Sequence, residues 1–152
     1  MEIDRDGLEV LDREECLRLL DGPVVGRIAG TSGALPFVLP VGYALDGDSI
    51  VVETGWGTTL NFATSGSVVA FEVDNLHERG HSGWTVMVTG VAEEVLDGFE
   101  VERLRRLLHD DRDGRDQRFV RISSELVSGR RTHRTHRHAR SRAAARAVQR
   151  IG

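Results

Sequence analysis

Residues 35–63 constrain the fold more than any other stretch of this sequence. They read LPFVLPVGYALDGDSIVVETGWGTTLNFA, two runs rich in Val, Ile and aromatic residues around Asp46-Gly47-Asp48. Strand-forming residues on both sides of an Asp-Gly turn are typical of a β-hairpin, which we expect over residues 37–44 and 49–53. The composition then changes to glycine and threonine, so the hairpin runs directly into a loop.

The segment after this hairpin, Thr54-Gly55-Trp56-Gly57-Thr58-Thr59, has the composition of a phosphate-binding loop. Its glycines let backbone N–H groups approach a ligand, and its hydroxyls can donate to phosphate oxygens. Residues 60–63 then open a short predicted helix, whose N-terminus favours an anion. An ordinary connection has the same composition, so the loop alone does not decide between a phosphate site and a plain turn.

Four further runs complete a pattern of six predicted strands. They lie at residues 24–29, 67–74, 84–96 and 119–122. Helices do not alternate with these strands, which argues against a parallel sheet and for a small antiparallel barrel. Gly26, inside the first of these strands, indicates a bulge or a close approach of another part of the chain.

Two short helices accompany the strands. Asp12 followed by Glu15 matches the pattern of a helix N-terminus, and this helix should end at Asp21-Gly22. After Asp97-Gly98, the spacing of Leu104, Leu107 and Leu108 indicates a second helix of about ten residues.

Length and composition are those of one globular domain. The chain has 152 residues, of which 39% are hydrophobic and 29% are charged. No run approaches the roughly 18 apolar residues that a transmembrane helix needs, and residues 1–6 do not begin a signal peptide. We therefore expect a cytoplasmic protein that does not contact a membrane. The single cysteine, Cys16, excludes an intrachain disulfide, and its neighbours indicate a buried thiol.

Charge is distributed unevenly along the chain. All 20 basic residues are arginine, and eight of them lie between Arg130 and Arg150, where there is no Asp or Glu. Residues 1–129 therefore carry a formal charge of −12, and the tail carries +8. We expect a folded domain over residues 1–131 and a disordered or loosely helical Arg/His/Ala tail over residues 132–152. We do not expect the acidic domain to bind nucleic acid; only this tail could do so.

The sequence offers no complete set of residues for hydrolysis or metal binding. A nucleophile elbow is absent, and the histidines of the domain, His77, His81 and His109, lie in segments expected to be loops or helix ends. The tail histidines have arginines within two residues, which repel a divalent cation, so we expect no metal site. We assign no catalytic residue.

Two further features have both a structural and a functional interpretation. Glu72 and Asp74 share one face of the predicted strand 67–74, where they are either an acid–base pair or solvent-exposed carboxylates. Trp84 starts a strand after a glycine, where its ring either covers a cofactor or caps the core.

Five motifs follow one another in an order and spacing characteristic of one family. They are Pro40-Val41-Gly42-Tyr43, the Asp-Gly turn, Thr-Gly-x-Gly-Thr-Thr-Leu at 54–60, Val69-Ala70-Phe71-Glu72-Val73-Asp74, and Gly83-Trp84 leading to Gly90-Val91-Ala92-Glu93-Glu94-Val95. The chain resembles the pyridoxamine 5′-phosphate oxidase-like, FMN-binding split-barrel proteins, in particular their short actinobacterial-type members. The resemblance covers residues 8–131, and residues 38–95 are its most specific part.

This resemblance implies a mainly β fold, a six-stranded antiparallel split barrel with short flanking helices. It also implies homodimers with an FMN site in each groove between subunits, and apolar strand residues such as 86–88 offer surface for a second copy. The strand that begins at Trp84 would lie at this interface, near the flavin. The cofactor would supply the chemistry, with hydride arriving at its N5, while the protein orients the ring and holds the phosphate. The residues implied are Pro40, Val41, Gly42 and Tyr43 at the isoalloxazine edge, and Thr54, Gly57, Thr58, Thr59 and Leu60 around the ribityl phosphate.

One position departs from the family pattern. Where relatives commonly carry Lys or Arg, this chain has Thr59, which replaces a charged contact to the phosphate by a neutral hydroxyl. Arg27 or the partner subunit's Arg121 could supply the missing charge. The C-terminal substrate-binding motif of true pyridoxamine-phosphate oxidases is absent, so vitamin B6 is not the expected substrate.

Together these observations predict an FMN-dependent oxidoreductase that acts on a small organic substrate. Two alternatives stay open at this point. One keeps the fold and uses the deazaflavin F420 as cofactor. The other is a non-catalytic ligand-binding module whose basic tail contacts nucleic acid or an acidic partner.

Overall fold

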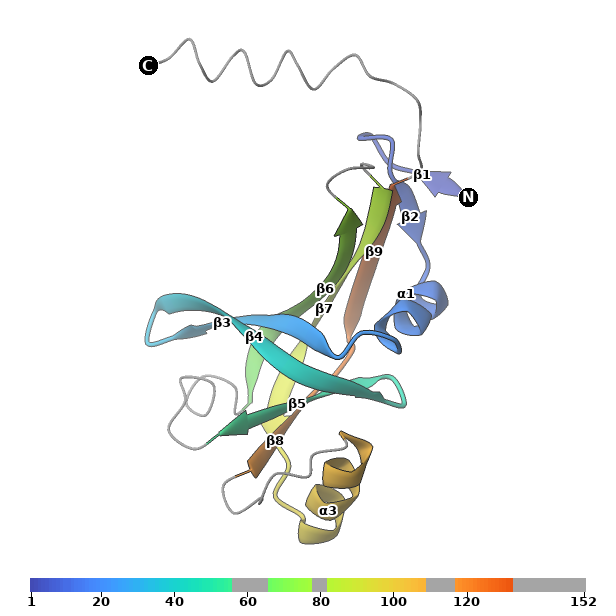
Figure 1. Cartoon of the computed structure of the whole chain (residues 1–152). Coiled ribbons are helices and arrows are strands. Elements are labelled where there is room, and N and C mark those ends of the chain that lie inside the picture. Colours follow the sequence, from blue (N-terminus) through green and yellow to red (C-terminus); the bar gives the residue numbers. More distant parts are fainter. Residues whose placement is uncertain (56–65, 78–81, 109–116, 133–152) are drawn as a thin grey trace.

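The computed structural model describes residues 1–55, 66–77, 82–108 and 117–132. Within these ranges β-strands dominate, and two short helices lie at the side of the sheet (Figure 1). The elements are β1 (Glu2–Ile3), β2 (Glu9–Leu11), α1 (Arg13–Leu20), β3 (Val25–Ser32), β4 (Leu35–Asp46), β5 (Ser49–Gly55), β6 (Ser67–His77), β7 (Ser82–Glu94), α3 (Gly98–Leu107), β8 (Gln117–Ile122) and β9 (Leu126–Thr132).

Six of the strands close into a barrel. They follow the ring order β3–β4–β5–β8–β7–β6, and β6 pairs with β3 to complete the ring. Every pairing around the ring is antiparallel. The predicted fold class, a mainly β six-stranded antiparallel barrel with short flanking helices, is therefore confirmed.

β9, β2 and β1 extend the sheet beyond the barrel, and the sequence did not predict these three strands. The extension starts on β7, which pairs with β9 through residues 83–89 and with β8 through residues 92–94. One long strand thus belongs to the barrel and to the extension at the same time.

The first arginines of the basic segment lie in β9. Arg130 Nε is 2.9 Å from Asp4 Oδ2, and Arg131 pairs with Glu15 and, at 3.5 Å, with Glu9. Two of the eight arginines counted with the tail are therefore strand residues, and acidic side chains of the N-terminal segment neutralise them. Residues 133–152 lie outside the described ranges.

The helices predicted after Asp12 and after Asp97-Gly98 are both present, and the N-cap predicted at Asp12 is confirmed. Asp12 Oδ1 accepts a hydrogen bond from Glu15 N (2.8 Å), and Asp97 Oδ1 accepts one from Glu100 N (2.9 Å). These bonds satisfy backbone donors that have no partner inside the helix. In the described part of the chain, no helix has the length and apolar character needed to cross a bilayer.

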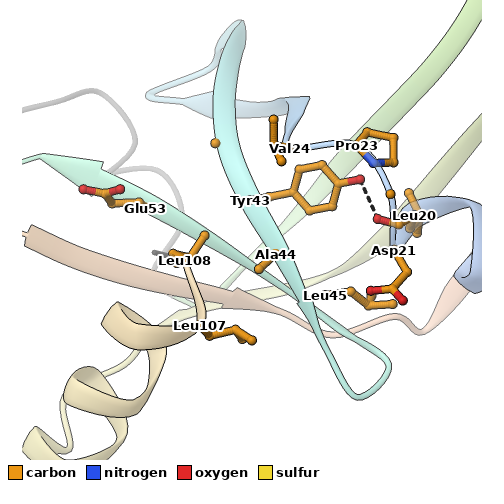
Figure 2. Close-up of a pocket in the computed structure, with 12 residues that line it drawn as sticks. Leu20, Asp21, Pro23, Val24, Tyr43, Ala44, Leu45, Glu53, Leu107 and Leu108 are labelled. Carbon is orange, nitrogen blue, oxygen red and sulfur yellow. Dashed lines mark hydrogen bonds between the residues drawn. The ribbon is translucent and has the colours of Figure 1, made fainter. Parts of the chain in front are cut away.

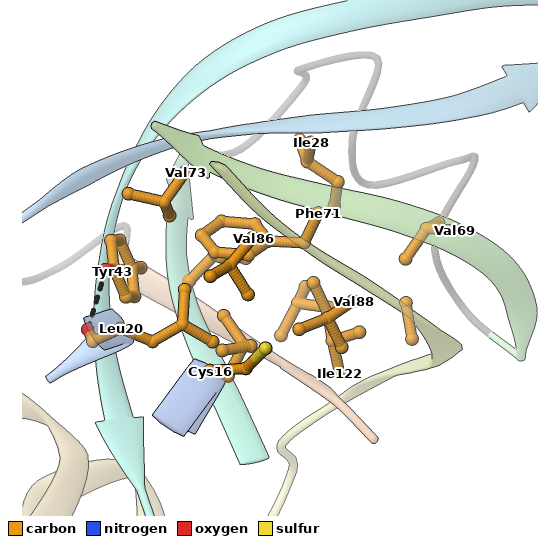
Figure 3. Packing of buried hydrophobic residues seen from close by; sticks show 14 of the residues in the cluster. Cys16, Leu20, Ile28, Tyr43, Val69, Phe71, Val73, Val86, Val88 and Ile122 are labelled. Atoms are coloured by element: carbon orange, nitrogen blue, oxygen red, sulfur yellow. Dashed lines mark hydrogen bonds between the residues drawn. The ribbon is translucent and has the colours of Figure 1, made fainter. Parts of the chain in front are cut away.

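The barrel interior is a close-packed aliphatic and aromatic core (Figure 3). Phe71 lies at its centre, and its ring meets the Tyr43 ring edge-on with centroids 4.9 Å apart. Cys16 of α1 is fully buried in the same cluster, as predicted. A Cβ atom at Gly26 would lie 2.4 Å from the Phe71 ring, so the close approach predicted at Gly26 is confirmed.

Candidate functional site

β4 changes its hydrogen-bonded partners in the middle of the motif Pro40-Val41-Gly42-Tyr43. Its pairing with β3 extends from Leu35 to Gly42, and its pairing with β5 begins at Tyr43. The two neighbouring strands lie on opposite edges of β4. The barrel wall is therefore incomplete on both sides of this point, which leaves room for a pocket.

A pocket of about 470 Å³ occupies this position (Figure 2). This volume lies in the range of small-molecule sites, which is about 300–1,000 Å³. Its walls come from β4 and β5, from the connection between α1 and β3, and from the C-terminal end of α3. The lining residues are Leu20, Asp21, Gly22, Pro23, Val24, Gly42, Tyr43, Ala44, Leu45, Glu53, Leu107 and Leu108.

Tyr43 fixes one wall of this pocket. Its hydroxyl donates a hydrogen bond to the carbonyl oxygen of Leu20 (2.7 Å), and its backbone N–H donates to the carbonyl oxygen of Val24 (3.1 Å). Burial of the phenol, together with the nearby charge of Asp21, raises the pKa of Tyr43 to about 12. The phenol therefore stays protonated and keeps donating to Leu20 throughout the physiological pH range.

Gly42 presents bare backbone to the pocket. A Cβ atom built on Gly42 would meet only the Val24 carbonyl oxygen, at 3.9 Å, which is ordinary van der Waals contact. Packing within the chain therefore does not require glycine here. Its absent side chain instead leaves the strand surface open toward the pocket.

Glu53 places a carboxylate on the pocket wall. It is half-buried, and its strand neighbours Val52 and Thr54 are buried on the other face of β5. Gln117 Nε2 donates to Glu53 Oε1 (3.1 Å), and Arg105 Nε donates to Gln117 Oε1 (2.9 Å). β8 and α3 thus help to hold this carboxylate in position.

The other described residues of the sequence-predicted site do not line the pocket. Pro40 is exposed on the outer face of β4, and Val41 packs against the core. Thr54 is only 6% exposed, on the strand face opposite to that of Glu53. Trp84 is partly buried against the barrel core, which agrees with its structural interpretation.

The two arginines considered for the phosphate are both engaged in ion pairs within the chain. Arg27 Nη1 lies 3.1 Å from Glu72 Oε2 and 2.9 Å from Asp74 Oδ2. These contacts confirm that Glu72 and Asp74 share one face of β6. Both carboxylates are ion-pair partners of Arg27. Arg121 lies 2.8 Å from oxygens of Asp46 and of Glu100. Neither arginine is among the described residues that line the pocket.

The remaining predicted positions, Gly57, Thr58, Thr59 and Leu60, lie outside the described residues. The predicted helix at 60–63 lies outside them as well. Among the described residues there is no group of three or more His, Cys, Asp or Glu side chains that could hold a metal ion.

Sequence reasoning missed several lining residues. Leu107 and Leu108 end α3 and reach the pocket only through the tertiary fold, as does Asp21 after α1. Glu53 had a usable signal, because it is the one charged residue in the apolar run 50–53 and immediately precedes Thr54.

Comparison with known proteins gives one consistent result. A protein from Mycobacterium tuberculosis, the uncharacterized protein Rv0080, is 37% identical over 124 residues, which cover 78% of this chain and 82% of that protein. The FAD-binding protein from Mycobacterium smegmatis superimposes with a TM-score of 0.66 at 26% identity, covering 83% of this chain and 99% of that one. An FAD-binding protein from Mesorhizobium loti gives a TM-score of 0.69 at 28% identity, covering 82% and 96%.

A protein-family model matches most of the chain. The family model described as pyridoxamine 5′-phosphate oxidase matches residues 12–131, which contain the barrel, α1, α3 and most of β9. The closed antiparallel barrel and the split-barrel flavin proteins that superimpose on it agree with this match. The chain therefore belongs to the pyridoxamine 5′-phosphate oxidase family of split-barrel proteins.

Proposed function

We propose that the protein binds a flavin whose isoalloxazine ring lies in the pocket at Gly42 and Tyr43. The observation that carries this proposal is the pocket at the partner exchange of β4, where Gly42 leaves the strand surface open. The flavin phosphate would then lie toward the Gly/Thr segment that follows β5. The family match and the FAD-binding relatives support a flavin as the ligand class.

FMN is the flavin that we propose first. It requires only a ring site, which Gly42 and Tyr43 would provide, and a site for one phosphate, which we propose in the Gly/Thr segment after β5. FAD is the second candidate, because two relatives of 26% and 28% identity are FAD-binding proteins.

The activity that follows is oxidation or reduction of a small organic substrate. A bound flavin supplies the redox chemistry, so the protein need not supply an acid or a nucleophile. The residues of this chain bind and orient the ring: Val24, Leu107 and Leu108 offer apolar contacts, and Tyr43 holds the connection after α1 in place. We assign no catalytic side chain.

We also propose that the protein is a homodimer. The outer face of the sheet carries a row of small and apolar residues across five neighbouring strands, and its two ends are 64% and 69% exposed. The row consists of Val38, Ala29, Ala70, Thr89 and Leu126. The three residues between the ends are partly exposed, and a two-fold dimer would bury the whole row on both copies.

The surface expected from the sequence for this dimer was wrong in one respect. Val86 and Val88 are fully buried within the chain, because their side chains point into the barrel core. Of residues 86–88 only Met87, which is 46% exposed, lies on the outer face. The interface that we propose therefore consists of the alternate residues of the same strands.

Direct titration with FMN and with FAD tests the flavin proposal. We expect the parent protein to quench flavin fluorescence on binding. The variant Gly42→Val should bind at least tenfold more weakly, because its side chain fills the space against which the ring would lie. Gly98→Val is the matched control, since a Cβ atom at Gly98 also meets nothing within 4 Å but lies at the start of α3.

Three outcomes would contradict the proposal. If neither FMN nor FAD binds, the proposed flavin-binding function is wrong. Equal affinities of the parent and Gly42→Val would place the ring elsewhere. If F420 binds more tightly than FMN and FAD in a competition titration, the cofactor is the deazaflavin and not a flavin.

A further inference from the structure

Glu53 is a fixed negative charge at the point where β5 separates from β4. The last β4–β5 pair is Tyr43 with Val52, so Glu53 and Gly42 follow directly on either side of the opening. Both residues line the pocket, and Figure 2 shows Glu53 on its β5 wall. The hydrogen bond from Gln117, which Arg105 in turn contacts, restricts where the Glu53 carboxylate can lie.

The charge of a flavin ring depends on its oxidation state. The oxidised ring is neutral. Two-electron reduction adds two electrons and one proton, so the reduced ring carries one negative charge in mildly alkaline solution. A nearby carboxylate therefore repels the reduced ring and leaves the oxidised ring almost unaffected, and partial burial strengthens this repulsion.

We infer that Glu53 makes the pocket bind the oxidised flavin more tightly than the reduced flavin and thereby lowers the reduction potential of the bound cofactor. This inference rests on the proposed function, because it needs the ring beside Gly42. Glu53 then acts as a tuning residue and takes no part in proton or hydride transfer.

Asp21 contributes to the same effect more weakly. It lines the pocket from the α1 side, and in Figure 2 Tyr43 and Ala44 lie between it and Glu53. Asp21 is exposed, so water and salt screen its charge. Its influence on the bound flavin should therefore vanish at high ionic strength, whereas that of the half-buried Glu53 should persist.

The test compares the dissociation constants of oxidised and dithionite-reduced FMN, measured without oxygen in mildly alkaline buffer. In the parent protein the reduced form should bind more weakly than the oxidised form. The variant Glu53→Gln keeps the side-chain size and removes the charge, so the ratio of the two constants should fall about tenfold, which is about 30 mV for a two-electron couple. Glu53→Asp, which keeps the charge, should retain most of the ratio.

Glu93→Gln is the control, because Glu93 is an exposed carboxylate on β7 that does not line the pocket. Unchanged ratios in Glu53→Gln and in the control, with FMN bound by both, would overturn the inference and leave the flavin function intact. A ratio that falls equally in both variants would also overturn it, since the effect would then reflect net charge. If the parent protein does not bind oxidised FMN, both this inference and the proposed FMN function are wrong.

Discussion

Gly90 marks a very close approach between β7 and the residue after β8. A Cβ atom at Gly90 would lie 1.7 Å from the carbonyl oxygen of Ser123. Ser123 N donates to the Val91 carbonyl oxygen and Val91 N donates to Ser123 Oγ, each at 3.0 Å, so the two segments are tied together. Neither backbone can move away without breaking these hydrogen bonds.

We therefore expect Gly90→Ala to destabilise the protein by about 3 kcal/mol or more, because backbone atoms have to shift. Urea unfolding measures this loss. Gly98→Ala introduces the same atom where nothing lies within 4 Å and should change the free energy of unfolding by less than about 0.5 kcal/mol. Equal stabilities of the two variants would contradict the close approach.

Thr59 carries a prediction from the sequence alone, since it lies outside the described residues. A charged donor contributes about 1.5–3 kcal/mol to binding a phosphate, of which a threonine hydroxyl recovers only part. Thr59→Lys should therefore bind FMN about ten- to hundredfold more tightly than the parent, as measured by titration. An FMN dissociation constant no lower than that of the parent, in a folded variant, would show that the phosphate does not lie at Thr59.

At the scale of elements, α3 is held on the barrel by a small core and an ion network. Leu104 packs against Val51 and Phe119, and Arg103 and Arg121 both contact Asp46. The hydrogen bond from Arg103, supported by Arg121, lowers the pKa of Asp46 to about 2. Because Leu107 and Leu108 line the pocket, this network also positions a pocket wall.

The pKa of Asp46 predicts how stability depends on pH. Its folded-state value of about 2 lies below the ordinary 3.8, so folding favours the ionised form. The resulting stabilisation is fully present above about pH 4 and is lost as the pH falls toward 2. Since Arg103 is half-exposed, we expect it to amount to only about 1–2 kcal/mol.

Acid unfolding of Asp46→Asn tests this expectation. The variant should be less stable than the parent at neutral pH, and the difference should shrink below about pH 3. Asp48→Asn in the same hairpin is the matched control, because Asp48 is more exposed and pairs with Arg13 instead. A difference between parent and Asp46→Asn that is constant with pH would mean that the ion network does not favour the ionised carboxylate.

Elements determined by local sequence were predictable, and elements determined by tertiary pairing were not. The hairpin of β4 and β5 and both helices carry turn and N-cap residues within the segments themselves. β9 reads LVSGRRT, which has little strand character, and it is a strand because β7 and β2 pair with it. β1 and β2 are too short to show periodicity.

The same distinction applies to the pocket. Gly42 and Tyr43 belong to a motif that the family resemblance identifies, and both line the pocket. Arg27 and Arg121 were candidates because of their charge, but only the fold shows that acidic neighbours contact them. Asp21, Leu107 and Leu108 have no local signal, because they reach the pocket from elements far away in the sequence.

At the scale of the whole molecule, the proposed dimer can be tested on its outer face. Leu126→Glu places a charge at one end of the apolar row and should convert a dimer into a monomer of 16.8 kDa, as measured by light scattering. Leu96→Glu is the control, because Leu96 is 81% exposed and lies outside the row. A parent that is already monomeric at micromolar concentration would contradict the dimer and a flavin site shared between subunits.

The basic tail provides a second prediction at this scale. Because Arg130 and Arg131 belong to β9 and are paired with acidic residues, a truncation should begin after Thr132. If the tail binds nucleic acid, removal of residues 133–152 should abolish retention of DNA at low salt, with folding unchanged. Retention that survives the truncation would exclude the tail as the binding element.

The order of strands around the barrel has a consequence for how the chain folds. β3 with β4, β4 with β5, and β6 with β7 can pair as soon as each hairpin has been synthesised, because their partners are adjacent in sequence. The barrel can close only after β8 has been made, because β8 pairs with β5. The paired residues Ile50 and Ile122 lie far apart in the sequence. Such non-local pairing is slow, since the intervening loop loses entropy before contacts form. During synthesis, the open edge of β5 therefore remains available to other chains until residues 117–122 have emerged, and this interval is when the nascent protein is most exposed to aggregation.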